Sequence, residues 1–215
     1  MLALFRPWLI LVGSFLLYCS VILASIFNGT GLESAIRDLG QTCGLSVFVG
    51  SVSNLGYLIF CSSAAIPLFA SLTSTFSVRS QNKSLLLSGG IFSAWLTLDD
   101  MFLIHDRYVN QEVLYVIYAA FAVYLLIRHR ITIQKTGGSL IFLASVTLMG
   151  LSIVTDKFQR VLGSLFSLSY QEVQFFEEGL KFMGQSYWLY FWCIASAFAI
   201  NTSLKEAFLR HTDSD

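Results

Sequence analysis

The sequence predicts an all-α polytopic membrane protein, a bundle of six transmembrane helices with both termini in the cytoplasm. Three observations support this fold class. Only 12% of the 215 residues are charged and 55% are hydrophobic, whereas a soluble domain is about 25% charged. Several apolar stretches are close to the roughly 20 residues that a helix needs to cross the hydrocarbon core. These stretches are continuous instead of alternating, which argues against a transmembrane β-barrel.

Six stretches have the length and composition of membrane spans. They are residues 7–27, 53–74, 84–104, 110–127, 138–155 and 179–200. The first exceeds the apolar core of about 7–15 residues in a signal peptide, so we expect it to remain as a span. Pro67 lies inside the second span and should kink it or free a carbonyl group. Residues 1–204 therefore form a predicted six-span domain, and residues 205–215 form a short cytoplasmic tail.

The charged residues predict the orientation of these spans. Eight of the 13 basic residues fall on one side of a six-span topology: Arg6, Arg79, Lys83, Arg128, Arg130, Lys135, Lys205 and Arg210. Cytoplasmic segments are rich in Lys and Arg, so this side is predicted to be cytoplasmic. Most acids fall on or near the opposite, outer face: Glu33, Asp38, Asp99, Asp100, Asp106, Glu112, Asp156, Glu172, Glu177 and Glu178.

Polar residues recur at helical spacing in three of the spans. They are Ser93, Thr97 and Asp100 in the third span, Ser145, Ser152 and Asp156 in the fifth, and Gln171, Gln174, Glu178, Lys181 and Gln185 in the sixth. Positions three, four and seven apart share one face of a helix. Lipid cannot satisfy such groups, so they should face the interior of the bundle. We expect the three stripes to meet in one acidic pocket near the outer face.

The pocket residues suggest both acid–base and metal-binding roles. Asp100, Glu178 and Lys181 are the candidate catalytic residues, with Lys181 tuning or orienting the acids. Asp100, His105, Asp156 and Glu178 are the candidate ligands of a divalent metal ion. A carboxylate-rich set with at most one imidazole suits magnesium, manganese or calcium, with zinc or iron as alternatives. No motif indicates an organic cofactor.

His105 and Asp99 are weaker candidates on a regular helix. Asp99 and Asp100 point about 100° apart, and Asp100 shares a face with the polar stripe of its span. His105 lies roughly 140° around the helix from Asp100. It reaches the pocket only if the helix loosens near Leu103. The alternative for His105 is a solvated position at the interface, or a pair with Asp106.

The buried acids need an electrostatic partner. Asp100 and Asp156 lie at C-terminal helix ends, where the helix dipole disfavours an acid by roughly 0.3–1 kcal/mol. A bound cation, Lys181, an arginine such as Arg107 or Arg160, or protonation would each offset this cost. Within the sixth span, Glu178 and Lys181 are spaced to form an internal ion pair.

The start of the last predicted helix has a recognisable capping pattern. Ser169 is followed three residues later by Glu172, the spacing of a capping box. Acids in a first helical turn are favoured by the helix dipole. We therefore expect a structural role for Glu172, in contrast to Glu178, which lies almost two turns further in.

Three functions are compatible with the acidic pocket. The first is a cation-dependent membrane-embedded enzyme acting on a lipid or another amphiphile. The second is a proton- or cation-coupled transporter or channel, in which the acids form the outer half of a pathway. The third is a structural or assembly subunit of a membrane complex, in which the acids form ion pairs and the many aromatic residues (19 Phe, 9 Tyr and 4 Trp) pack against lipid or partners.

Composition also predicts partners and compartment. The expected partners are the lipid bilayer and other membrane proteins. A formal net charge of +0 lacks the basic patch of a nucleic-acid-binding protein. Short loops and compact size favour a multi-pass protein of a bacterial inner or plasma membrane.

Overall fold

The computed structural model describes residues 7–29, 43–46, 48–73 and 80–212, and their regular structure is helical, as predicted. The helices are α1 (Pro7–Phe27), α4 (Ser51–Thr73), α5 (Ser80–Phe102), α6 (Ile104–Arg107), α7 (Gln111–Lys135), α8 (Ser139–Lys157), α9 (Gln159–Phe166) and α10 (Tyr170–Thr212). The chain divides into two compact units, Met1–Ser51 and Val52–Asp215. The first unit contains α1, and the second contains the bundle and the candidate site.

Among the described residues, four helices are long and apolar enough to cross a membrane: α4, the Asn82–Phe102 part of α5, α7 and α8. The apolar stretch described in α1, Tyr18–Phe27, is shorter. Helix α10 runs for 43 residues and begins with an acidic turn. It extends beyond both ends of the predicted span 179–200. The polar residues on either side of the apolar stretch continue the same helix. A helix is present at each of the six predicted ranges, and four of these helices have the character of spans.

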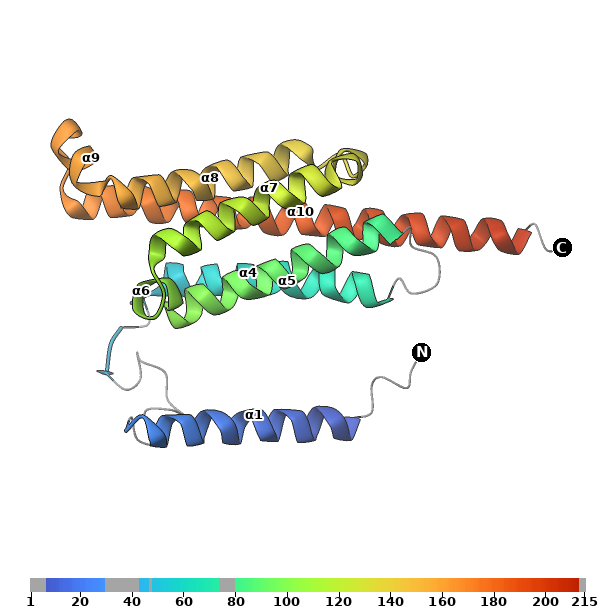
Figure 1. Ribbon diagram of the computed structural model, residues 1–215, viewed down its shortest axis with the longest axis horizontal. Helices are drawn as coiled ribbons and strands as arrows, with labels where there is room; N and C mark the ends of the chain where they lie inside the picture. Colours follow the sequence, from blue (N-terminus) through green and yellow to red (C-terminus); the bar gives the residue numbers. More distant parts are fainter. Residues whose placement is uncertain (1–6, 30–42, 47, 74–79, 213–215) are drawn as a thin grey trace. The chain divides into compact units, whose positions relative to one another are not determined.

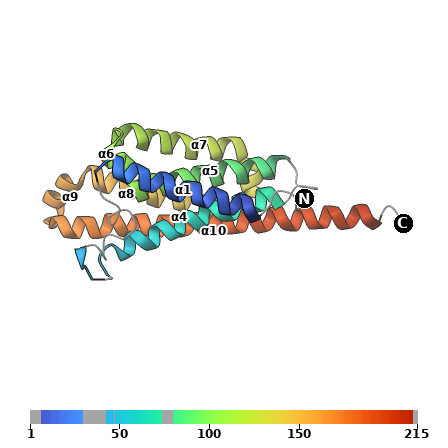
Figure 2. The same cartoon turned by 90° about the horizontal axis from the view of Figure 1, so that it is seen from below.

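The Val52–Asp215 unit is a bundle in which α4, α5, α7, α8 and α10 run alongside one another (Figure 1). In both Figure 1 and Figure 2, α6 and α9 lie at one end of this bundle, and the C-terminal part of α10 extends past the other end. Helix α4 continues as one helix through Pro67. The end with α6 and α9 is also where α5 and α8 finish and α7 starts, so it collects the acids of these helices.

Helices α8 and α10 make the most extensive contact in the bundle. The small residue Gly184 allows the two helices to approach closely. A Cβ atom at Gly184 would lie 2.6 Å from Cγ of Met149 on α8. The hydroxyl of Ser145 also donates a hydrogen bond to the Gly184 carbonyl oxygen, at 2.8 Å. Small residues and interhelical hydrogen bonds are the usual means of packing membrane helices.

An aromatic core closes the middle of the bundle. Trp188 and Trp192 of α10 are fully buried, and their rings meet edge to face at a centroid distance of 5.4 Å. The Trp188 indole N–H donates to the hydroxyl of Ser93, at 2.9 Å. Gly89 of α5 makes room for the second tryptophan, because a Cβ atom there would lie 1.7 Å from the Trp192 ring. This core forms the floor beneath the candidate site.

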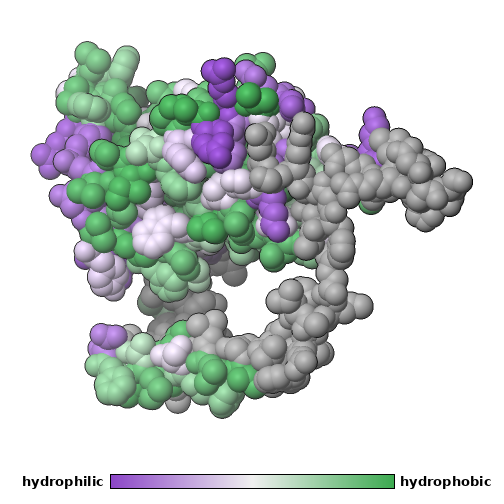
Figure 3. All heavy atoms as spheres, turned by 45° about the vertical axis from the view of Figure 1, so that its right-hand side comes forward, coloured by the Kyte–Doolittle hydropathy of each residue, from purple (hydrophilic) through white to green (hydrophobic). Residues whose placement is uncertain are grey.

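The outer surface of the bundle is largely apolar. Figure 3 shows hydrophobic side chains over much of one face. Exposed large side chains include Val116 and Ile127 of α7 and Leu140 of α8, which is 80% exposed. Apolar surface of this extent marks contact with a membrane or another protein, in keeping with the four candidate spans.

Candidate functional site

A cavity of about 350 Å³ lies inside the bundle, between α4, α5, α7, α8 and α10. Its polar lining comes from the helix ends near α6, and its apolar lining from the turns deeper in each helix. The polar and ionisable lining residues are Ser53, Tyr57, Asp99, Asp100, His105, Gln111, Tyr115, Tyr118, Ser152, Asp156, Glu177, Glu178 and Lys181. The cavity falls within the typical range of ligand pockets, about 300–1,000 Å³.

Asp99 and His105 form a hydrogen-bonded pair at a break between helices. Helix α5 ends at Phe102, and Leu103 takes a left-handed conformation with φ 53° before α6 begins. This turn brings His105 back over α5, where its Nδ1 lies 2.9 Å from one Asp99 oxygen. The His105 backbone N–H donates to the other oxygen, also at 2.9 Å. A left-handed leucine costs about 1–3 kcal/mol, and these two hydrogen bonds help to hold it.

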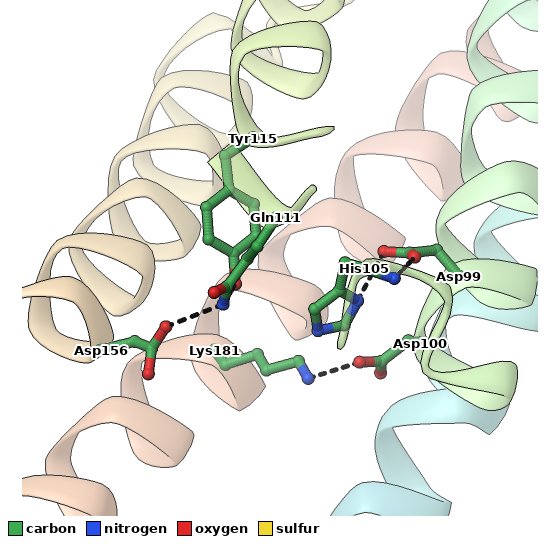
Figure 4. Close-up of polar contacts among 7 residues, drawn as sticks. All are labelled: Asp99, Asp100, His105, Gln111, Tyr115, Asp156 and Lys181. Atoms are coloured by element: carbon green, nitrogen blue, oxygen red, sulfur yellow. Dashed lines mark hydrogen bonds and ion pairs between the residues drawn. The ribbon is translucent and has the colours of Figure 1, made fainter. Parts of the chain in front are cut away.

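Asp100 is neutralised by a residue from another helix. The Lys181 ammonium of α10 donates to Asp100 Oδ1 at 2.5 Å (Figure 4). Asp100 is only 7% exposed. Of the partners considered from the sequence, the structure thus selects Lys181 for Asp100, whereas Arg107 and Arg160 are exposed. The ion pair of Lys181 therefore joins α5 and α10, while the charge of Glu178 on its own helix also acts on Lys181.

Asp156 has a neutral partner. The Gln111 side chain, in the first turn of α7, donates to Asp156 Oδ2 at 3.1 Å. The same amide group lies 2.7 Å from the Tyr115 hydroxyl. Figure 4 shows Asp156 and Gln111 opposite the pairs formed by Asp99, Asp100 and their partners. The carboxylate of Asp156 therefore faces the cavity without a basic contact among the described residues.

Glu178 and Gln185 extend the polar lining along α10. Both border a second, water-sized cavity of about 10 Å³, together with Asp100 and Lys181. Gln185 is 2% exposed, and its Nε2 has no hydrogen-bond partner among the described residues. Its amide fits closely against Gly56 of α4, where a Cβ atom would lie 2.7 Å from Gln185 Oε1. Glu178 forms no hydrogen bond or ion pair within the described residues.

The five predicted site residues Asp100, His105, Asp156, Glu178 and Lys181 all line the large cavity. The left-handed turn at Leu103 interrupts the helix, and this interruption allows His105 to reach the cavity. Asp99 lines the cavity beside Asp100, although the regular-helix geometry favoured Asp100 alone. His105 pairs with Asp99, and the Asp106 side chain lies outside what the structure describes.

A metal centre stays a prediction. Among the described side chains, no group of three or more His, Cys, Asp and Glu residues is arranged to hold a metal ion. Asp100 is engaged by Lys181, and Asp156 by Gln111. Each of these contacts uses one carboxylate oxygen, so a divalent ion bound by the predicted ligands would share both carboxylates with their present partners.

Sequence reasoning missed several lining residues. Gln111, Tyr115 and Tyr118 all project from α7, a helix whose polar groups are too few to form a recognisable stripe. The spacing of four between Gln111 and Tyr115 was the available signal, since such positions share one helix face. Asp99 was disfavoured because it points about 100° away from Asp100 on the helix, and its pairing with His105 depends on the turn at Leu103.

The capping box at the start of α10 is confirmed. Glu172 accepts hydrogen bonds at 2.7 Å from the Ser169 backbone N–H and hydroxyl, and its own N–H lies 3.3 Å from that hydroxyl. The backbone and side-chain hydrogen bonds from Ser169 lower the pKa of the exposed Glu172 carboxyl. Glu172 therefore stabilises the helix terminus and lies outside the cavity.

Fold and site define an all-helical protein with four candidate membrane helices around an amphipathic internal cavity. Residues 8–198 match the family described as a domain of unknown function, DUF8692, and the chain belongs to this family. The matched region includes every residue that lines the cavity. No curated protein and no solved structure matches the chain.

Proposed function

We propose that this protein is a membrane-embedded enzyme that carries out acid–base chemistry on a lipid or another amphiphile inside the bundle. The observation that carries the proposal is the Asp99–His105 pair, which lines a cavity with a charged end and an apolar floor. Few membrane helices bury ionisable groups without a functional reason. The cavity ends on the buried aromatic core, which favours a dead-end pocket over a transport pathway.

His105 is the proposed general base. In the proposed tautomer, Nδ1–H donates to the Asp99 carboxylate and Nε2 is the nitrogen that accepts a proton. Figure 4 shows the second ring nitrogen turned away from Asp99, toward the space between Lys181 and Asp156. A histidine oriented in this way can take a proton from a substrate hydroxyl or a water molecule. The carboxylate has the role of orienting the base, as in other acid–base sites.

Lys181, Asp100 and Glu178 complete the proposed machinery. The Lys181 ammonium, held by Asp100, would stabilise negative charge that develops on the substrate. Glu178 on the same helix would hold the departing group. In an alternative form of this proposal, a divalent ion is bound by Asp100, His105, Asp156 and Glu178, and His105 is then a ligand instead of the general base. Stoichiometric metal in purified protein, lost in Asp156→Asn, would support it.

The proposed setting is a six-span topology with both termini in the cytoplasm, in a bacterial inner or plasma membrane. The end of the bundle with α6 and α9 would then face outward. The bilayer and other membrane proteins are the proposed partners. The Glu112–Lys157 ion pair lies outside the cavity, so this acidic end also has conventional surface contacts.

Comparison of lipid profiles tests the enzymatic proposal. Purified protein is incubated with a total lipid extract, and the products are followed by mass spectrometry. We expect a lipid to be converted by the native protein and the rate to fall by about 10²-fold or more in His105→Ala and Asp99→Asn, because general base catalysis contributes about 10²–10⁴. The matched control is Glu112→Gln, outside the cavity. Equal conversion by His105→Ala and the native protein would refute the proposal.

A further inference from the structure

The charges that line the cavity are strongly unequal. Its ionisable lining contains five carboxylates, Asp99, Asp100, Asp156, Glu177 and Glu178, against Lys181 and the titratable His105. Lys181 is already committed to Asp100, and His105 to Asp99. Among the described residues Asp156 has no basic contact, and Glu178 shares the charge of Lys181 with Asp100 without forming an ion pair of its own. Both carboxylates are half-buried, and carboxylates removed from water are costly unless an opposite charge accompanies them.

A negative headgroup is poorly suited to this lining. It would meet one ammonium group, whose charge is already offset by Asp100. It would also lie among the remaining carboxylates, and like charges in a cavity of low polarity repel strongly. A positive headgroup would instead supply the missing counter-charge to Asp156 and Glu178.

Aromatic side chains favour an organic cation. Tyr57, Tyr115 and Tyr118 line the cavity at the level of its polar residues. Positive nitrogen groups are attracted to the faces of aromatic rings, and ammonium ligands are commonly recognised in this way. A bare metal ion gains less from such rings than from additional oxygen ligands.

The deeper lining suits an apolar chain. Phe60, Phe92, Leu96 and Trp188 form the far part of the cavity, and Trp188 directs its N–H away to Ser93. The lining therefore changes along the helices from carboxylates, through tyrosines, to hydrocarbon and aromatic rings. An amphiphile would place its headgroup beside Asp156 and Glu178 and its chain on the aromatic floor.

Gln185 supplies an independent sign of a missing polar group. Its buried Nε2 lacks a partner among the described residues, and it borders the water-sized cavity that Asp100, Glu178 and Lys181 also line. A cavity of roughly 10–15 Å³ holds one water molecule when several polar groups surround it. Such a water would link Gln185 to Glu178 and fix that carboxylate beside the headgroup.

We propose that the cavity binds an amphiphile with a positively charged amine or quaternary ammonium headgroup, held by Asp156 and Glu178. This inference rests on the proposed function, which supplies the amphiphilic substrate. It adds the charge of that substrate's headgroup. It assigns Asp156 and Glu178 to headgroup recognition.

Titration calorimetry of the full chain in a neutral detergent tests the charge preference. The probes share one chain length: hexyltrimethylammonium, hexanesulfonate and hexanol, with magnesium chloride as the ion alone. We expect the ammonium probe to bind at least about tenfold more tightly than the sulfonate or the alcohol, because its charge is attracted to the carboxylates and to the tyrosine rings. Tighter binding of hexanesulfonate would overturn the inference, as would binding of magnesium alone. This comparison uses the native protein and needs no variant.

Isosteric variants test the assigned residues. Asp156→Asn and Glu178→Gln should each weaken binding of the ammonium probe by about tenfold, and Glu112→Gln should leave it unchanged. Equal affinity in all three variants would overturn the assignment. Binding does not depend on turnover: a preference for ammonium without lipid conversion would support this inference while the proposed function fails. A preference for sulfonate with lipid conversion would overturn the inference alone.

Discussion

At the scale of single residues, the site is a set of acids, each held by a different kind of partner. Asp99 has an imidazole, Asp100 an ammonium group and Asp156 an amide. Helical spacing was sufficient to predict that Asp100, Asp156, Glu178 and Lys181 point inward. Helical spacing was insufficient to predict the partners of these side chains, because the partners come from other helices and depend on how the helices are positioned. The role of His105 depended on one backbone conformation, at Leu103.

The contact between Asp100 and Lys181 should contribute to stability. Lys181→Met leaves a buried carboxylate without its partner, and we expect a loss of about 1–3 kcal/mol. Thermal unfolding of the purified protein in detergent measures this as a lower melting temperature. The control is Lys157→Met, whose partner Glu112 is exposed, and where we expect a change of at most about 0.5 kcal/mol. Adding Asp100→Asn to Lys181→Met should restore part of the loss, and a further additive loss would contradict the account.

At the scale of helices, the six apolar stretches were sufficient to locate the long helices but not their ends. Helix α5 stops two residues before the predicted bound because of the left-handed turn at Leu103. Helix α7 continues to Lys135, past the apolar stretch, since its basic end remains a good helix former. The close contact of α5 with α10 depends on Gly89 facing Trp192, a match that periodicity does not reveal.

Gly89 should be required for the contact between α5 and α10. Gly89→Ala places a methyl group on the Trp192 ring, and we expect a loss of about 1–3 kcal/mol from overpacking. Gly179→Ala on α10 is the matched control, because a Cβ atom there meets nothing within 4 Å. The control should be neutral or stabilising by up to about 1 kcal/mol. Equal thermal stability of the two variants would contradict the packing described for the core.

The start of α10 should depend on pH through Glu172. The pKa of its carboxyl in the folded protein is lowered below the ordinary value of 4.5. Its contribution to the helix terminus is therefore present above pH 4.5 and is lost as the pH falls through the lowered pKa. Hydrogen exchange of the amides of the first turn of α10 should accelerate, relative to the intrinsic rate, over that acidic range. Glu172→Gln should abolish this pH dependence, and an unchanged dependence would exclude the capping role.

At the scale of the whole molecule, the bundle collects its acids at one end and its aromatic core in the middle. Composition was sufficient to predict the helical class, and four of the described helices are long and apolar enough to cross a membrane. The cavity itself was not visible in the sequence, because its volume depends on the relative positions of five helices. Family membership covers residues 8–198, so the cavity-lining helices belong to the unit that defines this family.

Cysteine accessibility tests the proposed orientation. In a background with Cys19, Cys43, Cys61 and Cys193 replaced by serine, Ser164→Cys in α9 should react with a membrane-impermeant maleimide in intact cells. Lys135→Cys, at the opposite end of α7, should react only after the membrane is opened. Both positions are exposed in the structure, so a difference reports sidedness. The reverse pattern would contradict the prediction that basic segments are cytoplasmic.

The central claim is that an amphiphile enters the cavity instead of covering the outer surface. Photocrosslinking in membranes tests it most directly, with an ammonium amphiphile that carries a diazirine in its alkyl chain and with peptide mapping by mass spectrometry. We predict crosslinks to the cavity residues Leu96, Tyr118 and Met149, which disappear when an excess of the unreactive amphiphile is added. Crosslinks confined to surface residues such as Val116, Ile127 and Leu140, and unaffected by competitor, would contradict the account.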